Sequence, residues 1–155
     1  MRGIGKITRR RQAGLATVEM VAITPVMLLL LLGIGEFGKA LMEYNTLNKS
    51  VRDAARFVAG TALLGTTGTV QVTADIESAA RNLVVFGNVA GTGNPLLPSL
   101  AADQISVRDA GNDLVVVQAD YPYVPIMGPV LQTFGFGDGM GLDFTLTASV
   151  TMRAL

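Results

Sequence analysis

The pattern of apolar and polar residues changes near Gly35, and each half of the pattern predicts part of one long helix. From Leu15 to Gly35 the chain is almost entirely apolar, with Glu19 as its one charged residue. Beyond Gly35 apolar residues recur every three or four positions, which indicates one face of a helix. The two patterns predict a single helix from Leu15 to Ala59 that stops at Gly60. The residues of the predicted outer apolar face are Phe37, Leu41, Tyr44, Leu47, Val51, Ala55 and Val58.

Charged residues of opposite sign are neighbours on the predicted polar side of this outer half. Pairs spaced three or four residues apart on a helix surface can attract each other, and we expect these pairs to lie on the solvent side. Arg52 and Arg56 fit either a solvated helix face or a contact with another subunit. The pairs are Glu36 with Lys39, Lys39 with Glu43, and Lys49 with Asp53.

The rest of the chain predicts a second helix and about three antiparallel strands, hence an α+β fold. Thr73 and Gly87 are suitable residues to begin and end a helix from Ala74 to Phe86. Apolar and polar residues then alternate with a period of two in three stretches, which is typical of half-buried antiparallel strands. The stretches are Ile105–Arg108, Val115–Tyr123 and Leu142–Met152, with a turn at Asp109–Asp113 between the first two.

Residues 124–141 are too apolar for an ordinary loop, although they contain many glycines. We expect a short helix that covers the sheet. The functional alternative is a docking surface for a neighbouring subunit or for the membrane face, because clustered exposed apolar residues mark such contacts.

Charge is distributed unevenly around the apolar segment and predicts its orientation. Residues 1–14 contain five bases and no acid, whereas the remainder contains seven bases and twelve acids. Leu15–Gly35, with 21 residues, is long enough to span a hydrocarbon core of ~30 Å at ~1.5 Å per residue. The positive-inside rule places residues 1–14 in the cytoplasm and residues after about Lys39 on the far side. An acidic outer part also argues against nucleic acid as a partner.

The N-terminal features resemble the prepilin-peptidase signal of type IV pilins and pseudopilins. They occur in the order of that signal: a basic leader, Gly14, four further residues, Glu19 and an apolar helix. Two alternatives remain. One is an uncleaved membrane anchor, and the other is a secretory signal peptide cut at the small residues 33–35. Signal-peptide apolar regions normally span only ~7–15 residues.

The resemblance implies cleavage between Gly14 and Leu15, and this gives Glu19 a physical role. The new α-amino group of Leu15 would be largely protonated at neutral pH, because such groups have pKa values of about 7.7–8.0. Glu19 lies four residues on, one helical turn away. An amine and a carboxylate can offset each other's burial, within one subunit or between two. Glutamate in a membrane segment is a functional candidate by default.

Several further motifs are similar to those of TadE-like proteins of tight-adherence (Flp) pilus systems. The resemblance implies a pilin-like fold, processing by a prepilin peptidase, and pilus assembly with other pilins and the Tad secretion machinery. It also implies a location in the bacterial inner membrane with a periplasmic outer domain. Met20 stands where major Flp pilins carry an aromatic residue, which favours a minor pilin or pseudopilin. The motifs are Glu36-Phe37-Gly38, Tyr44–Leu47, Arg52-x-x-Ala55-Arg56, Tyr121-Pro122-Tyr123 and Thr147–Arg153.

Phe37, Tyr44, Arg52 and Arg56 are therefore candidates for subunit contacts. The predicted organisation is a leader at 1–14, a transmembrane helix at 15–35, an amphipathic stem at 36–60 and an extracytoplasmic α+β domain at 61–155. If no cleavage occurs, the alternative is a single-pass envelope protein whose outer domain binds a partner or ligand.

Composition excludes the common enzyme classes. The chain contains neither cysteine nor histidine, so catalytic triads and zinc sites in their usual forms are impossible. The Gly33–Gly38 stretch matches G-x-G-x-x-G, but it follows an apolar helix and not a strand, which argues against a dinucleotide site. We expect no enzyme activity, no cofactor and no metal.

Overall fold

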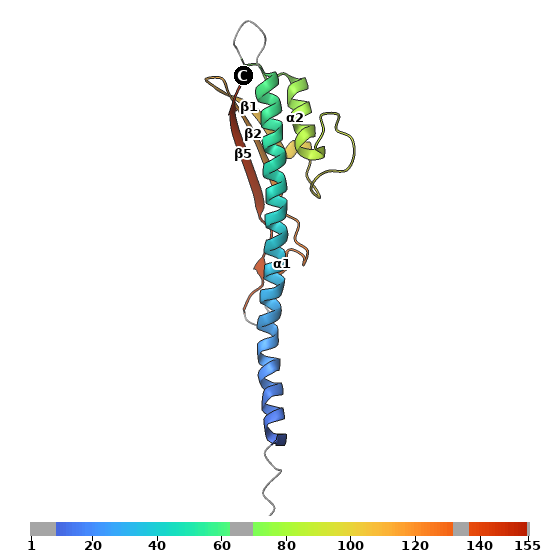
Figure 1. The fold of residues 1–155 in the computed structure, drawn as a ribbon, viewed down its shortest axis with the longest axis vertical. Coiled ribbons are helices and arrows are strands. Elements are labelled where there is room, and N and C mark those ends of the chain that lie inside the picture. Colours follow the sequence, from blue (N-terminus) through green and yellow to red (C-terminus); the bar gives the residue numbers. More distant parts are fainter. Residues whose placement is uncertain (1–8, 63–69, 132–136, 155) are drawn as a thin grey trace, which may run out of the picture.

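The computed structural model describes residues 9–62, 70–131 and 137–154, and for residues 9–13 and 131 it describes the backbone alone. Residues 1–8 of the predicted leader therefore lie outside the described part. The fold is α+β, as predicted: one long helix, a second helix and a three-stranded antiparallel sheet. Figure 1 shows the second helix and the sheet packed beside the C-terminal half of the long helix, whose N-terminal half stands alone.

Helix α1 (Arg9–Thr61) confirms the prediction of one continuous helix and extends it by six residues at its N-terminal end. It also continues by two residues at its C-terminal end, so Gly60 is not the predicted stop. It runs through Pro25 without a break. Within the described residues, α1 is the one helix long and apolar enough to cross a membrane. Its most apolar stretch is not covered by any other part of the described chain.

Helix α2 (Ala74–Phe86) has the predicted bounds because its caps satisfy the free backbone groups at its ends. The Ile76 amide donates to the Thr73 hydroxyl, with 3.4 Å between nitrogen and oxygen. Gly87 adopts a left-handed conformation, with φ of 74°, and its amide donates to the Leu83 carbonyl at 3.0 Å. Glycine is the residue that adopts this conformation without steric cost.

The main sheet has the order β1–β2–β5, with both neighbouring pairs antiparallel. A short 3₁₀ helix (Ala102–Gln104) leads into β1. The β1–β2 turn lies within the predicted Asp109–Asp113 but is limited to Asn112 and Asp113, at φ of 53° and 60°, because β1 continues to Gly111. Strand β5 keeps the predicted alternation but begins three residues later than expected, so Leu142 and Phe144 precede it. The strands are β1 (Ile105–Gly111), β2 (Leu114–Pro122) and β5 (Thr145–Arg153).

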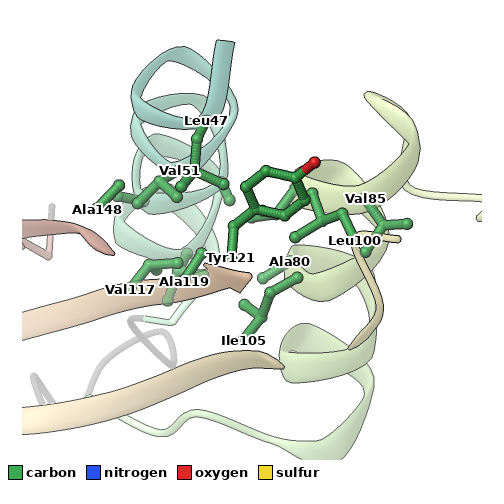
Figure 2. Packing of buried hydrophobic residues seen from close by; sticks show 14 of the residues in the cluster. Leu47, Val51, Ala80, Val85, Leu100, Ile105, Val117, Ala119, Tyr121 and Ala148 are labelled. Atoms are coloured by element: carbon green, nitrogen blue, oxygen red, sulfur yellow. The ribbon is translucent and has the colours of Figure 1, made fainter. Parts of the chain in front are cut away.

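The core lies between the C-terminal half of α1, helix α2 and the inner face of the sheet. Figure 2 shows the Tyr121 ring of β2 between side chains from both helices, with Leu47 of α1 and Val85 of α2 on either side. Tyr121 and Leu47 are fully buried. Burying such side chains contributes roughly 1.5–3 kcal/mol each, which fastens the sheet to the upper turns of α1.

The buried face of α1 differs from the predicted one. Leu47, Val51, Ala55 and Val58 are buried as expected, but Phe37 is 71% exposed. The supposedly solvated Glu36 and Glu43 are instead 5% and 8% exposed. The difference is confined to the first turns after Gly35, where Glu36, Ala40 and Glu43 are buried one position before the predicted Phe37, Leu41 and Tyr44. Beyond these turns the predicted face is in the core, joined by Ser50 and Ala54.

The described residues of the 124–141 segment form no helix, so that prediction was wrong. They contain two paired two-residue strands, β3 (Val130–Leu131) and β4 (Met140–Gly141). Gly128 and Gly137 have φ of 88° and 109°, values that a right-handed helix excludes. Residues 132–136 lie outside the described part of the chain.

Candidate functional site

The N-terminal part of α1 presents the predicted processing residues on an uncovered helix surface. Gly14 and Leu15 lie inside α1, and the Leu15 side chain is 70% exposed. Glu19 is exposed on the next turn and has no ion-pair or hydrogen-bond partner among the described residues. The structure thus offers one acidic group within an apolar helix surface. The large exposed side chains of that surface include Val18, Met20, Val21, Ile23, Met27, Leu30, Leu31 and Ile34.

Glu36 marks the point where the uncovered part of α1 gives way to the packed part. Its Oε1 accepts a hydrogen bond from the Tyr123 hydroxyl at 2.8 Å and another from the Ile126 amide at 2.9 Å. The same hydroxyl lies 3.2 Å from the Glu36 backbone carbonyl oxygen. Hydrogen bonds to a charged acceptor are among the stronger ones in proteins. The carboxylate therefore fastens the end of β2 and the following segment to α1.

Lys39 joins the same cluster one turn further along α1. Its Nζ lies 3.5 Å from Glu43 Oε1, which confirms the predicted Lys39–Glu43 pair. It also donates to the Val124 carbonyl oxygen and lies 5.0 Å from the centre of the Tyr123 ring. A cation at this distance from an aromatic face is attracted by the ring. Lys39 thus partly balances the buried Glu43 while holding the chain that follows β2.

The two tyrosines of the cluster are held in their neutral form. Burial, followed by the charge of Glu43, raises the pKa of Tyr121 to about 12. Burial and the hydrogen bond to Glu36, followed by the charges of Glu36 and Glu43, raise the pKa of Tyr123. The Tyr121 hydroxyl and Glu43 Oε2 are buried without a hydrogen bond of standard geometry in the described structure. We call Glu36, Lys39, Glu43, Tyr121 and Tyr123 the acidic anchor.

The acidic anchor was not predicted from the sequence, although a signal for it was present. Glu36, Ala40, Glu43 and Leu47 are spaced by four, three and four residues, which places them on one helix face. The larger apolar side chains of the neighbouring stripe favoured the other face. Carboxylates at Glu36 and Glu43 on the core side of the helix would need hydrogen-bond donors. Tyr121 and Tyr123, at the end of the second predicted strand, could have been predicted to supply them.

The candidate subunit-contact residues are exposed but separate into two groups along α1. Phe37 and Tyr44 lie with Ala40 and Leu41 around an apolar groove that β5 completes with Leu146 and the preceding Phe144. Arg52 and Arg56 are exposed further along the helix, without ion-pair partners among the described residues. Within the same described residues, no three acidic side chains come close enough to hold a metal ion.

The family model described as "TadE-like protein" matches residues 14–56 of the chain, which confirms the resemblance for the motifs within that range. The match suggests involvement in Tad pilus assembly. It begins at Gly14 and ends inside α1, so it includes the uncovered apolar turns and the acidic anchor residues of the helix. No curated protein and no solved structure matches the chain.

Removing the hydroxyl of Tyr123 should weaken the attachment of the sheet to α1. We expect Tyr123→Phe to lower the free energy of unfolding by about 1.5–3 kcal/mol, because a buried charged acceptor loses a donor. The measurement is urea unfolding of the detergent-solubilised protein at pH 7. Tyr44→Phe, which removes a partly exposed hydroxyl on α1, is the control and should change little. Equal stability of the two variants would contradict this role for Glu36 and Tyr123.

Tyr121 should make the protein lose stability in strong base. Its pKa is raised from 10.0 to about 12 on folding, so the folded state holds the proton more tightly than the unfolded state. The associated stability is complete below about pH 10 and is lost as the pH rises towards about 12. We expect Tyr121→Phe to stay within about 1 kcal/mol of the parent at pH 7. Between pH 10 and 12 its unfolding free energy should fall less than that of the parent. Parallel declines would show that Tyr121 does not titrate as described.

Proposed function

We propose that the protein is a minor pilin or pseudopilin that takes part in the assembly of Flp-type (type IVb) tight-adherence pili. The observation that carries the proposal is the extent of the TadE-like match, which begins at Gly14 and follows α1 through its uncovered apolar turns. In this role the protein is not an enzyme and acts through contacts between helices. Gly14–Gly35 supplies a surface for lipid or for neighbouring helices, and the sheet stays attached to the outer part of α1.

The proposed location is the bacterial inner membrane, crossed once by residues 15–35. The five bases of residues 1–14 favour a cytoplasmic N-terminus by the positive-inside rule. The stem and the α+β domain then lie in the periplasm. The exposed apolar surface of α1 supports a lipid partner, because apolar surface of this extent is unfavourable in water.

The proposed processing step is cleavage of the Gly14–Leu15 bond by a prepilin peptidase. It removes the basic leader and leaves a cationic amine one helical turn from Glu19. That Glu19 is exposed without a partner in the described structure supports a role between subunits, since its carboxylate is accessible to a neighbour's amine. Phe37 and Tyr44, with the exposed Arg52 and Arg56, are the proposed contacts further along α1.

The N-terminus of the mature protein tests the proposed pathway. We expect intact-mass measurement and N-terminal sequencing of membrane-extracted protein to give Leu15 as the first residue when a prepilin peptidase is present, and Met1 when it is absent. Met1 in both samples would favour the uncleaved envelope protein instead. A terminus at Glu36 would indicate a signal peptide and would contradict the stem helix.

Glu19→Ala should separate membrane insertion from assembly. We expect insertion to be unchanged, because the substitution makes the span more apolar, while the number of assembled pili falls severely. Alkaline extraction of membranes measures insertion, and electron microscopy of cells measures pili. Asp53→Ala, which removes an exposed acid of α1 beyond the span, is the matched control and should leave piliation normal. Normal piliation of Glu19→Ala cells would refute the proposed role of Glu19.

A further inference from the structure

The chain segments on either side of β3 and β4 present a second apolar surface, distinct from that of the N-terminal turns of α1. We call the described residues 124–130 and 140–144 the foot. Figure 1 shows the foot beside α1, at the end of the main sheet that is nearer the N-terminus. Its apolar side chains point into solvent, with Ile126 62% and Met140 63% exposed. The other exposed apolar residues of the foot are Val124, Met127, Val130 and Phe144.

The acidic anchor fixes the position of the foot along α1. The Ile126 amide donates to Glu36 at 2.9 Å, and Lys39 donates to the Val124 carbonyl oxygen. Glu36 is the residue directly after the apolar run that ends at Gly35. If residues 15–35 cross the bilayer, as proposed above, these contacts hold the foot at the level where α1 leaves the hydrocarbon.

The chemistry of the foot fits a lipid surface better than water. Polar backbone groups at its start bond to α1, while apolar side chains face outwards. Asp138 and Asp143 are exposed nearby, so the fit is to the headgroup region and not to the hydrocarbon centre, where carboxylates are costly.

We propose that the foot rests on the outer surface of the bilayer that α1 crosses, with Ile126 and Met127 inserted among phospholipid headgroups and the first acyl carbons. The partner that covers this surface is lipid, because the foot adjoins the end of the proposed span and is held there by hydrogen bonds to α1. Apolar side chains of interfacial segments reach about 5–10 Å into this boundary. The inference rests on the proposed single-pass insertion.

Single tryptophans test the inference, because the natural chain contains none. The full-length protein is reconstituted into phosphatidylcholine–phosphatidylglycerol vesicles with or without lipids brominated near the headgroup or deep in the acyl chain. Ile126→Trp probes the foot. Leu30→Trp, in the apolar part of α1, reports insertion of the span. Thr151→Trp is the negative control, since its side chain is exposed on β5, six residues and ~20 Å from the strand end next to the foot.

We expect the shallow bromolipid to reduce Ile126→Trp emission at least twofold while leaving Thr151→Trp emission unchanged. Leu30→Trp should be quenched most by the deep bromolipid. Quenching of Leu30→Trp without quenching of Ile126→Trp would overturn the foot proposal alone. No quenching of Leu30→Trp would overturn the proposed span as well. If Ile126→Trp emission shifts with the protein-to-lipid ratio and is insensitive to bromine, the foot contacts a second copy of the chain and the lipid proposal is wrong.

Circular dichroism and thermal unfolding of the three variants check that each keeps the parent fold. Ile126 is exposed, so its replacement should not disturb packing. Met127→Trp, at a neighbouring side chain that is 47% exposed, provides a second probe of the same surface. It should show the shallow quenching expected of Ile126→Trp, and its failure to do so in a folded protein would also contradict the proposal.

Discussion

The buried carboxylate of Glu36 is the contact on which the arrangement of the chain depends. A single helix supplies both an uncovered apolar surface and one side of a packed core, and Glu36 lies where the first becomes the second. Its hydrogen bonds to Tyr123 and Ile126 fasten the lower end of the sheet to α1. The apolar core, which extends from Tyr121 and Leu47 to Val115 and Val58, holds the rest of the sheet. Without these bonds, the hydrogen bond from Lys39 to the Val124 carbonyl oxygen would be the remaining described polar contact between α1 and the residues just after β2.

Two acids on the core side of α1 carry an energetic cost that the surrounding groups offset. A buried charge is strongly unfavourable unless it is paired and hydrogen-bonded. Glu36 accepts hydrogen bonds from the Tyr123 hydroxyl and the Ile126 amide, and Glu43 forms an ion pair with Lys39. Tyr121 keeps its proton near Glu43 because deprotonation would add a second buried negative charge. The cluster therefore favours one pairing of helix and sheet over alternatives in which these acids would remain buried without donors.

Local signals in the sequence predicted most helices and strands correctly, whereas contacts between residues far apart in the chain could not be predicted from such signals. Thr73 and Gly87 define α2 through their own backbone geometry, and the alternation of Leu146, Ala148 and Val150 requires only a strand with one buried face. The inner face of α1 near Glu36 depends on groups 87 to 90 residues later in the chain, so the prediction failed at Phe37, Leu41 and Tyr44 and held from Leu47 onwards. The 124–141 segment was predicted as a helix from its apolar content, but Gly128 and Gly137 adopt φ values that a helix cannot accommodate.

The unbroken course of α1 has a mechanical consequence. The sheet is fastened to the helix at Glu36 and again around Leu47. The sheet and residues 36–61 of α1 therefore move together when the helix tilts. Residues 36–61 extend about 38 Å along that axis at ~1.5 Å per residue, and membrane helices tilt by about 20° on average. Such a tilt would carry the far end of the sheet sideways by about 13 Å. If α1 crosses the bilayer as proposed, a change in bilayer thickness that alters its tilt would move the β1–β2 turn sideways by a similar distance.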